Sequence, residues 1–136
     1  MKFRKFLENF PIRDDKMRSY TRIERLEKLL QEVLAESISR RIKDPKLGFV
    51  TVMGVQLSKD LHYAKVTVTV LGSEQIQEET MQVLDRASNF LREEISREVR
   101  MRYIPELKFV RSDIFEKQAR LDELFSLIRK EEKYEN

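Results

Sequence analysis

The 136-residue sequence contains no cysteine, no tryptophan and a single histidine, His62. The absence of cysteine excludes disulfide scaffolds, thiolate zinc sites and cysteine nucleophiles. One histidine alone supplies too few nitrogen ligands for a zinc site of the usual composition. The three glycines lie too far apart for a phosphate-binding loop or a dinucleotide fingerprint. We therefore predict a protein that is not an enzyme and that uses no metal, no cofactor and no small-molecule substrate.

Long apolar runs are also absent from the sequence. No stretch approaches the ~18–20 apolar residues that a membrane-spanning helix needs. The N-terminal residues 1–6 are basic and aromatic, and they lack the apolar stretch and small-residue cleavage site of a signal peptide. A chain of this length can bury a core in one domain without disulfides or metals. The sequence thus predicts a soluble, cytoplasmic protein with no membrane contact.

Charge of both signs is abundant, because charged residues make up 38% of the chain. The positive excess falls in residues 1–22, 40–46 and 86–112, whereas the segments between them are net acidic. If the fold joins these regions, the resulting basic patch suits a polyanion, because neutralised phosphates release counterions. Many basic residues also lie four places from a carboxylate, as Arg97 does from Glu93, which is typical of an ordinary solvated helix. Charge alone leaves both interpretations open.

Apolar periodicity predicts a first helix over residues 22–43. Thr21 and Glu24 fit a capping box at its start, and apolar residues then recur at steps of three and four. Asp44-Pro45 ends the pattern, since the residue before a proline is forced out of the helical region. Residues 1–19 show no such period, and we expect them to be a flexible basic arm.

Two strands are predicted next, over residues 49–58 and 62–71. In the second strand small apolar residues alternate with polar ones, so that one face belongs to the core. The short polar link between the two runs predicts an antiparallel hairpin. Gly72-Ser73 then breaks the strand and caps the following helix.

The segment 74–101 is helical in pattern but changes phase near Ala87-Ser88-Asn89. Because asparagine tolerates the left-handed conformation, we predict two helices that meet at a kink near residues 88–89. A turn at 103–106 and a strand over 107–111 complete an α-β-β-α-α-β domain over residues 20–112, and residues 113–136 supply a C-terminal helix and tail. The predicted core consists of Leu26, Leu30, Val33, Leu34, Val66, Val68, Leu91, Ile95, Val99 and Phe109.

The kink offers a candidate phosphate site. A break between helices exposes the backbone amides that open the second helix, and that end of a helix carries partial positive charge. Ser88 and Asn89 could add side-chain donors at this end. At 100° per residue, Arg97 and Arg100 fall opposite the apolar stripe, with Arg92 on its flank. Simple pairing of these arginines with nearby glutamates remains the competing interpretation.

Four segments resemble, in order, the signature of the bacterial ribosome-binding factor A family. They are Asp44-Pro45-Lys46-Leu47, the run from Val55 to Val66, Ala87-Ser88-Asn89-Phe90-Leu91-Arg92, and the run from Arg100 to Phe109. The resemblance implies an α+β fold, namely a type II K-homology-like domain with the helices on one face of a three-stranded sheet. It also implies an interhelical Ala-x-Gly kink in place of the GxxG loop, and here Asn89 stands where the family commonly has glycine.

The resemblance further implies a role in assembly of the small ribosomal subunit. Family members bind the free or immature 30S subunit, support 16S rRNA processing and maturation, and matter most in cold adaptation. Our first hypothesis is therefore a monomeric assembly factor that contacts 16S rRNA mainly at phosphates and 2′-hydroxyls. The alternative is a protein-interaction module that docks a partner through its amphipathic terminal segments. The candidate RNA-binding residues are Ser88, Asn89, Arg92, Arg97, Arg100, Arg102, Arg40, Arg41, Lys46, Lys59, Lys65 and Lys108.

Overall fold

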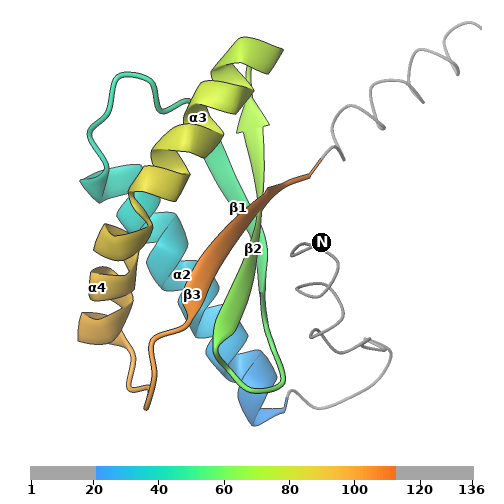
Figure 1. Cartoon of the computed structure of the whole chain (residues 1–136), viewed down its shortest axis with the longest axis vertical. Helices are drawn as coiled ribbons and strands as arrows, with labels where there is room; N and C mark the ends of the chain where they lie inside the picture. Colours follow the sequence, from blue (N-terminus) through green and yellow to red (C-terminus); the bar gives the residue numbers. More distant parts are fainter. Residues whose placement is uncertain (1–20, 113–136) are drawn as a thin grey trace, which may run out of the picture.

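The computed structural model describes residues 21–112, and the predicted N-terminal arm and C-terminal helix lie outside this part of the chain. Three helices and three strands follow one another in the order α-β-β-α-α-β, as the sequence predicts (Figure 1). The elements are α2 (Arg22–Arg41), β1 (Phe49–Leu57), β2 (Tyr63–Leu71), α3 (Glu74–Arg86), α4 (Ser88–Glu98) and β3 (Glu106–Arg111). None of the described helices combines the length and the apolar character needed to cross a membrane.

Helix α2 begins where the sequence predicts. The Thr21 side chain accepts a hydrogen bond from the backbone N–H of Glu24 at 3.2 Å and so satisfies one of the amides that open the helix. Leu30, Leu34 and Ile38 form its buried stripe. The helix ends at Arg41, two residues before the predicted end, because Ile42 is already extended.

The sheet has the order β1-β2-β3, with β2 at its centre. Strands β1 and β2 form the predicted antiparallel hairpin, and β3 pairs with β2 in parallel. Ala64, Val66, Val68 and Val70 of β2 are all buried, which confirms the predicted inward face. The three helices cover that face (Figure 1). Their apolar side chains meet it in one core.

Two helices replace a single long one after β2, as predicted. Ser73 caps α3 by accepting a hydrogen bond from the Ile76 amide at 3.3 Å, and Ala87 separates α3 from α4 with φ −85° and ψ 1°. The predicted extent to residue 101 is wrong, because α4 ends at Glu98 and Val99 is extended with φ −127° and ψ 130°. Arg100 and Arg102 therefore lie in the loop that leads to β3, and not on a helical face.

Most of the predicted core is buried as expected. Leu30, Leu34, Val66, Val68, Leu91 and Ile95 are completely buried, and Val99 is nearly so. Leu26, Val33 and Phe109 are only partly buried and pack at the margin of the core. The core also contains residues that the prediction did not include, namely Ile38, Val52, Leu57, Ala64, Val70, Leu84 and Leu107.

Candidate nucleic-acid interface

The ends of α2 and α4 meet at a buried carboxylate. Glu94 lies between Leu91 and Ile95 on the inner side of α4, and only 5% of it is exposed. Its oxygens pair with Arg41 Nε of α2 at 3.6 Å and with Arg97 of α4 at 3.7 Å. A buried charge needs such partners, because desolvation of an unpaired carboxylate costs several kcal/mol. Glu94 therefore holds two arginines from different helices side by side.

These two arginines remain accessible to a ligand. The side chains of Arg41 and Arg97 are 60% and 66% exposed, so each guanidinium keeps donors that face solvent. Arg97 pairs with Glu94, three residues earlier, and not with Glu93 as its spacing predicts. Arg40 directly precedes Arg41 and contacts Glu36 at 3.6 Å, and Arg100 lies three residues after Arg97 in the loop beyond α4; both are exposed. We call Arg40, Arg41, Arg97 and Arg100 the arginine surface.

The start of α4 is built differently from the prediction. Asn89 is not left-handed, because Leu61 is the only described non-glycine residue with positive φ, and Asn89 lies within the first turn of α4. The break needs only Ala87, whose amide still bonds to Val83 O and whose carbonyl accepts from the Leu91 amide at 2.9 Å. The Ser88 hydroxyl donates to Leu84 O at 3.5 Å, so it closes α3 and does not cap α4. The amides of residues 88–90 precede the first intrahelical bond of α4, as at any helix start.

Other predicted residues lie away from the arginine surface. Lys65 and Lys108 are paired in register on β2 and β3, on the sheet face opposite the helices, because their strand neighbours point into the core. Lys108 Nζ also contacts Glu106 at 3.3 Å. Lys59 is exposed in the hairpin turn, and Lys46 is exposed in the loop before β1. The structure thus does not gather the predicted residues on one surface.

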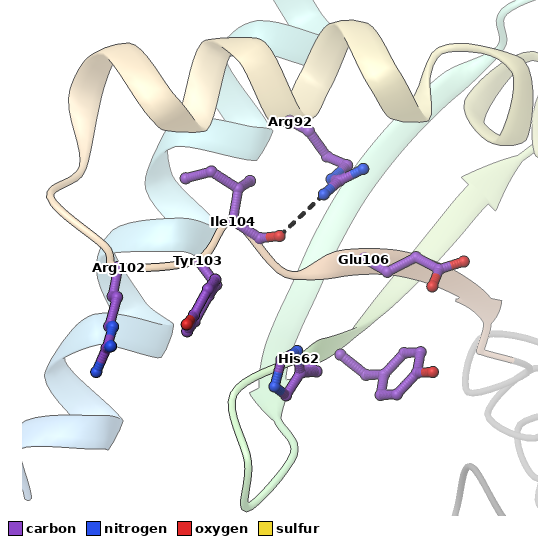
Figure 2. A pocket seen from close by; sticks show the side chains of 7 residues that line it. His62, Arg92, Arg102, Tyr103, Ile104 and Glu106 are labelled. Carbon is purple, nitrogen blue, oxygen red and sulfur yellow. Dashed lines mark hydrogen bonds between the residues drawn. The ribbon is translucent and has the colours of Figure 1, made fainter.

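Arg92 and Arg102 line a pocket of about 500 Å³ at the end of the hairpin. Figure 2 shows Tyr103 between Arg102 and His62, with Arg92 extending from α4 toward the loop that precedes β3. The rings of His62 and Tyr103 are stacked with centroids 5.5 Å apart and planes inclined by 26°, and Arg102 lies 5.5 Å from the centre of the Tyr103 ring. Arg92 donates to Ile104 O at 3.0 Å. Tyr63 and Glu106 complete the lining.

Sequence reasoning names Glu94 only as one possible partner of the arginines, and it misses both the burial of Glu94 and the stacked pair of His62 and Tyr103. Glu94 looks like one of several solvated glutamates, and only its position between Leu91 and Ile95 on the helix hints at burial. His62 and Tyr103 are far apart in the chain and come together through the pairing of β2 with β3, in which the Glu106 amide donates to His62 O at 2.8 Å. No local sequence pattern predicts a contact between residues so far apart.

Comparison with known proteins places this domain in one family of ribosome-binding factors. The family Ribosome-binding factor A matches residues 22–125. A ribosome-binding factor A of Thioalkalivibrio sulfidiphilus is 48% identical over 107 residues, which are 79% of this chain and 83% of that protein. The crystal structure of ribosome-binding factor A from Thermus thermophilus is 37% identical, with a TM-score of 0.60, and the match covers 65% of this chain and 93% of that chain.

A second coordinate set for the Thermus thermophilus factor was fitted into a cryo-EM map of a 30S-RbfA complex. It is also 37% identical to this chain, with a TM-score of 0.56 and coverage of 65% of this chain and 93% of that chain. The chain belongs to the ribosome-binding factor A family. Membership confirms the predicted K-homology-like α+β fold and the predicted non-enzymatic role in ribosome biogenesis.

Proposed function

We propose that this chain binds the free or immature 30S subunit as a cytoplasmic, monomeric assembly factor. It contacts 16S rRNA there and supports its processing and maturation, including during growth in the cold. The related Thermus thermophilus factor, whose coordinates were fitted into a map of a 30S complex, supports this proposal. The observation on this chain that carries it is the convergence of Arg41 and Arg97 on buried Glu94.

The arginine surface suits the backbone of folded RNA. Arginine presents several donors in one plane and can hold a phosphate with two of them at once. Two arginines anchored on one carboxylate lose less side-chain freedom on binding than free ones would. Structured RNA is bound largely through phosphates and 2′-hydroxyls, because its deep major groove is closed to side chains. The arginine surface is therefore the site that we assign to 16S rRNA.

The test is co-sedimentation of the full chain with purified small subunits across a series of salt concentrations. The variant Arg97→Gln/Arg100→Gln removes two cations and leaves Arg41 beside Glu94, so that the buried carboxylate keeps a partner. Reversal of Arg97 to glutamate is avoided, because it would place a second carboxylate next to Glu94. We expect affinity to fall at least about tenfold, ~1.4 kcal/mol, and the salt slope to fall by about one unit for each phosphate that is no longer neutralised.

Arg22→Gln/Lys28→Gln is the matched control, because it removes two exposed charges from the opposite end of α2. Equal reductions of affinity in both variants would mean that only total charge matters. Undiminished binding by the Arg97/Arg100 variant would remove the arginine surface from the interface. Binding that hardly changes with salt would favour the alternative of a protein partner, since an apolar contact is not screened.

A further inference from the structure

The pocket at the end of the hairpin combines flat rings with positive charge. Tyr103 is 55% exposed although its ring stacks on His62 and lies under Arg102 (Figure 2). An exposed stack of this kind presents aromatic faces and edges to solvent beside a cavity. Every nucleobase has a flat face that can join such a stack.

Arg92 adds hydrogen-bond donors and positive charge to the pocket. Its Nε is buried and has no hydrogen-bond partner among residues 21–112, although the guanidinium already donates to Ile104 O. A buried donor without a partner is costly, and few remain in folded proteins without a functional reason. The buried Nε is out of reach of a ligand, but a guanidinium has five N–H donors and Ile104 O uses only one of them, so the terminal nitrogens of Arg92 can donate to an acceptor in the pocket that Arg92 lines.

The charges around the pocket favour an anion that carries a ring. Glu106 is the only acidic residue of the lining, and Lys108 contacts its carboxylate at 3.3 Å. Arg92 and Arg102 then leave the pocket net positive. The lining is mostly polar, which speaks against a purely apolar occupant such as a hydrophobic peptide side chain. A flat ring joined to a phosphate, that is, a nucleotide, meets both requirements.

We propose that this pocket binds one unpaired nucleotide of RNA, with its base stacked against the His62–Tyr103 pair and its phosphate held by Arg102. Arg92 donates to the base or to its sugar from inside the pocket. The inference rests on the proposed binding of 16S rRNA and adds a base contact to a surface otherwise assigned to phosphates. Because Arg100 of the arginine surface is two residues before Arg102, one RNA strand can reach both the arginine surface and the pocket.

The experiment titrates the full chain with a single-stranded tetraribonucleotide that contains 2-aminopurine, whose fluorescence falls when it stacks. Tyr103→Leu removes the ring, and we expect it to weaken binding about five- to 150-fold and to abolish the quenching. Tyr103→Phe keeps the ring and should bind within about twofold of the unaltered chain. Phe49→Leu is the matched control, because Phe49 is an exposed aromatic residue at the far end of the hairpin. Arg102→Gln should weaken binding and lower its salt dependence without touching either ring.

Several results would overturn the inference. One is unchanged binding by both Tyr103→Leu and Arg102→Gln, and another is an equally large effect of Phe49→Leu. Adenosine monophosphate that binds as tightly as the tetranucleotide would overturn the assignment to an RNA strand.

Co-sedimentation with small subunits separates the two proposals. If the Arg97/Arg100 variant no longer binds subunits while both pocket variants still bind the tetranucleotide, the arginine surface stands and the pocket falls. If the unaltered chain quenches the probe yet fails to bind subunits, the proposed function falls and the pocket stands.

Discussion

At the scale of single residues, Asp60 organises the hairpin turn beside the pocket. Its Oδ1 accepts from the Ser58 hydroxyl at 2.6 Å and from the His62 amide at 3.1 Å. Ser58 Oγ in turn accepts from the Tyr63 amide at 3.0 Å. Leu61 adopts φ 64° within this turn, a conformation that costs a non-glycine residue roughly 1–2 kcal/mol. The hydrogen bonds of Asp60 and Ser58 fix the turn that presents His62.

The same hydrogen bonds make the turn sensitive to acid. The Ser58 hydroxyl, and then the His62 amide, stabilise the ionised carboxylate and hold the pKa of Asp60 below its ordinary value of about 3.9. A lowered folded pKa adds stability above the unfolded pKa, and this stability disappears as the pH falls through the folded pKa. We expect a carboxyl-detected NMR titration to give Asp60 a pKa below that of an unstructured aspartate. In Ser58→Ala that pKa should rise toward the ordinary value, and an unchanged value there would contradict the cause given.

The contacts of individual charged side chains are the feature that the sequence predicts least completely. Arg41, Arg92 and Arg97 are among the predicted residues, and Glu93 and Glu94 are both possible partners of the α4 arginines, but the sequence does not choose between these two glutamates. Arg97 could pair with Glu93 or Glu94 at helical spacing, and only the burial of Glu94 decides between them. Burial depends on the packing of α2 against α4, which a single sequence does not reveal.

At the scale of elements, periodicity located every described helix and strand but misplaced some of their ends. The stripe Leu91, Ile95 and Val99 continues past the end of α4, because Val99 is 5% exposed even in an extended conformation. An apolar residue can be buried equally well whether its backbone is helical or belongs to the extended segment after the helix. The apolar stripe therefore predicts a helix that is too long, and for this reason the sequence analysis places Arg100 on a helical face that Arg100 does not occupy.

The junction of β2 and α3 depends on one glycine. Gly72 has φ 135°, and a Cβ at this position would come within 3.0–3.2 Å of Ile76 side-chain atoms. Gly72→Ala should therefore lower the free energy of unfolding by about 1–3 kcal/mol. Gly54→Ala is the control, because nothing lies within 4 Å of its added Cβ, and it should be neutral or slightly stabilising. Urea denaturation of both variants checks this, and equal stabilities would contradict the strain at Gly72.

At the scale of the whole molecule, the parallel pairing of β3 with β2 decides which residues meet. It places Glu106 beside Tyr63 and Lys108 beside Lys65, and it carries Tyr103 toward His62. The chain crosses from β2 to β3 through α3 and α4, so these neighbours are far apart in sequence. The periodicity of residues 49–111 does not say which strand β3 joins; the order β1-β2-β3 appears only in the folded domain. The pocket could not be predicted for the same reason, whereas the two arginines of the ends of α2 and α4 already lay in regions of positive charge.

A substitution at Val68 tests the core between the sheet and the helices. Val68 is fully buried on the middle strand, with Val52 of β1 and Arg111 of β3 as register partners. Val68→Asp would bury an unpaired carboxylate, and we expect the free energy of unfolding to fall by more than roughly 4 kcal/mol, much of the stability of an ordinary domain. Thr51→Asp places the same group on an exposed position of β1 and should cost below about 1 kcal/mol. Urea denaturation followed by circular dichroism measures both variants. A cooperative transition of Val68→Asp at the midpoint of Thr51→Asp would contradict the inward face of β2 and the core built on it.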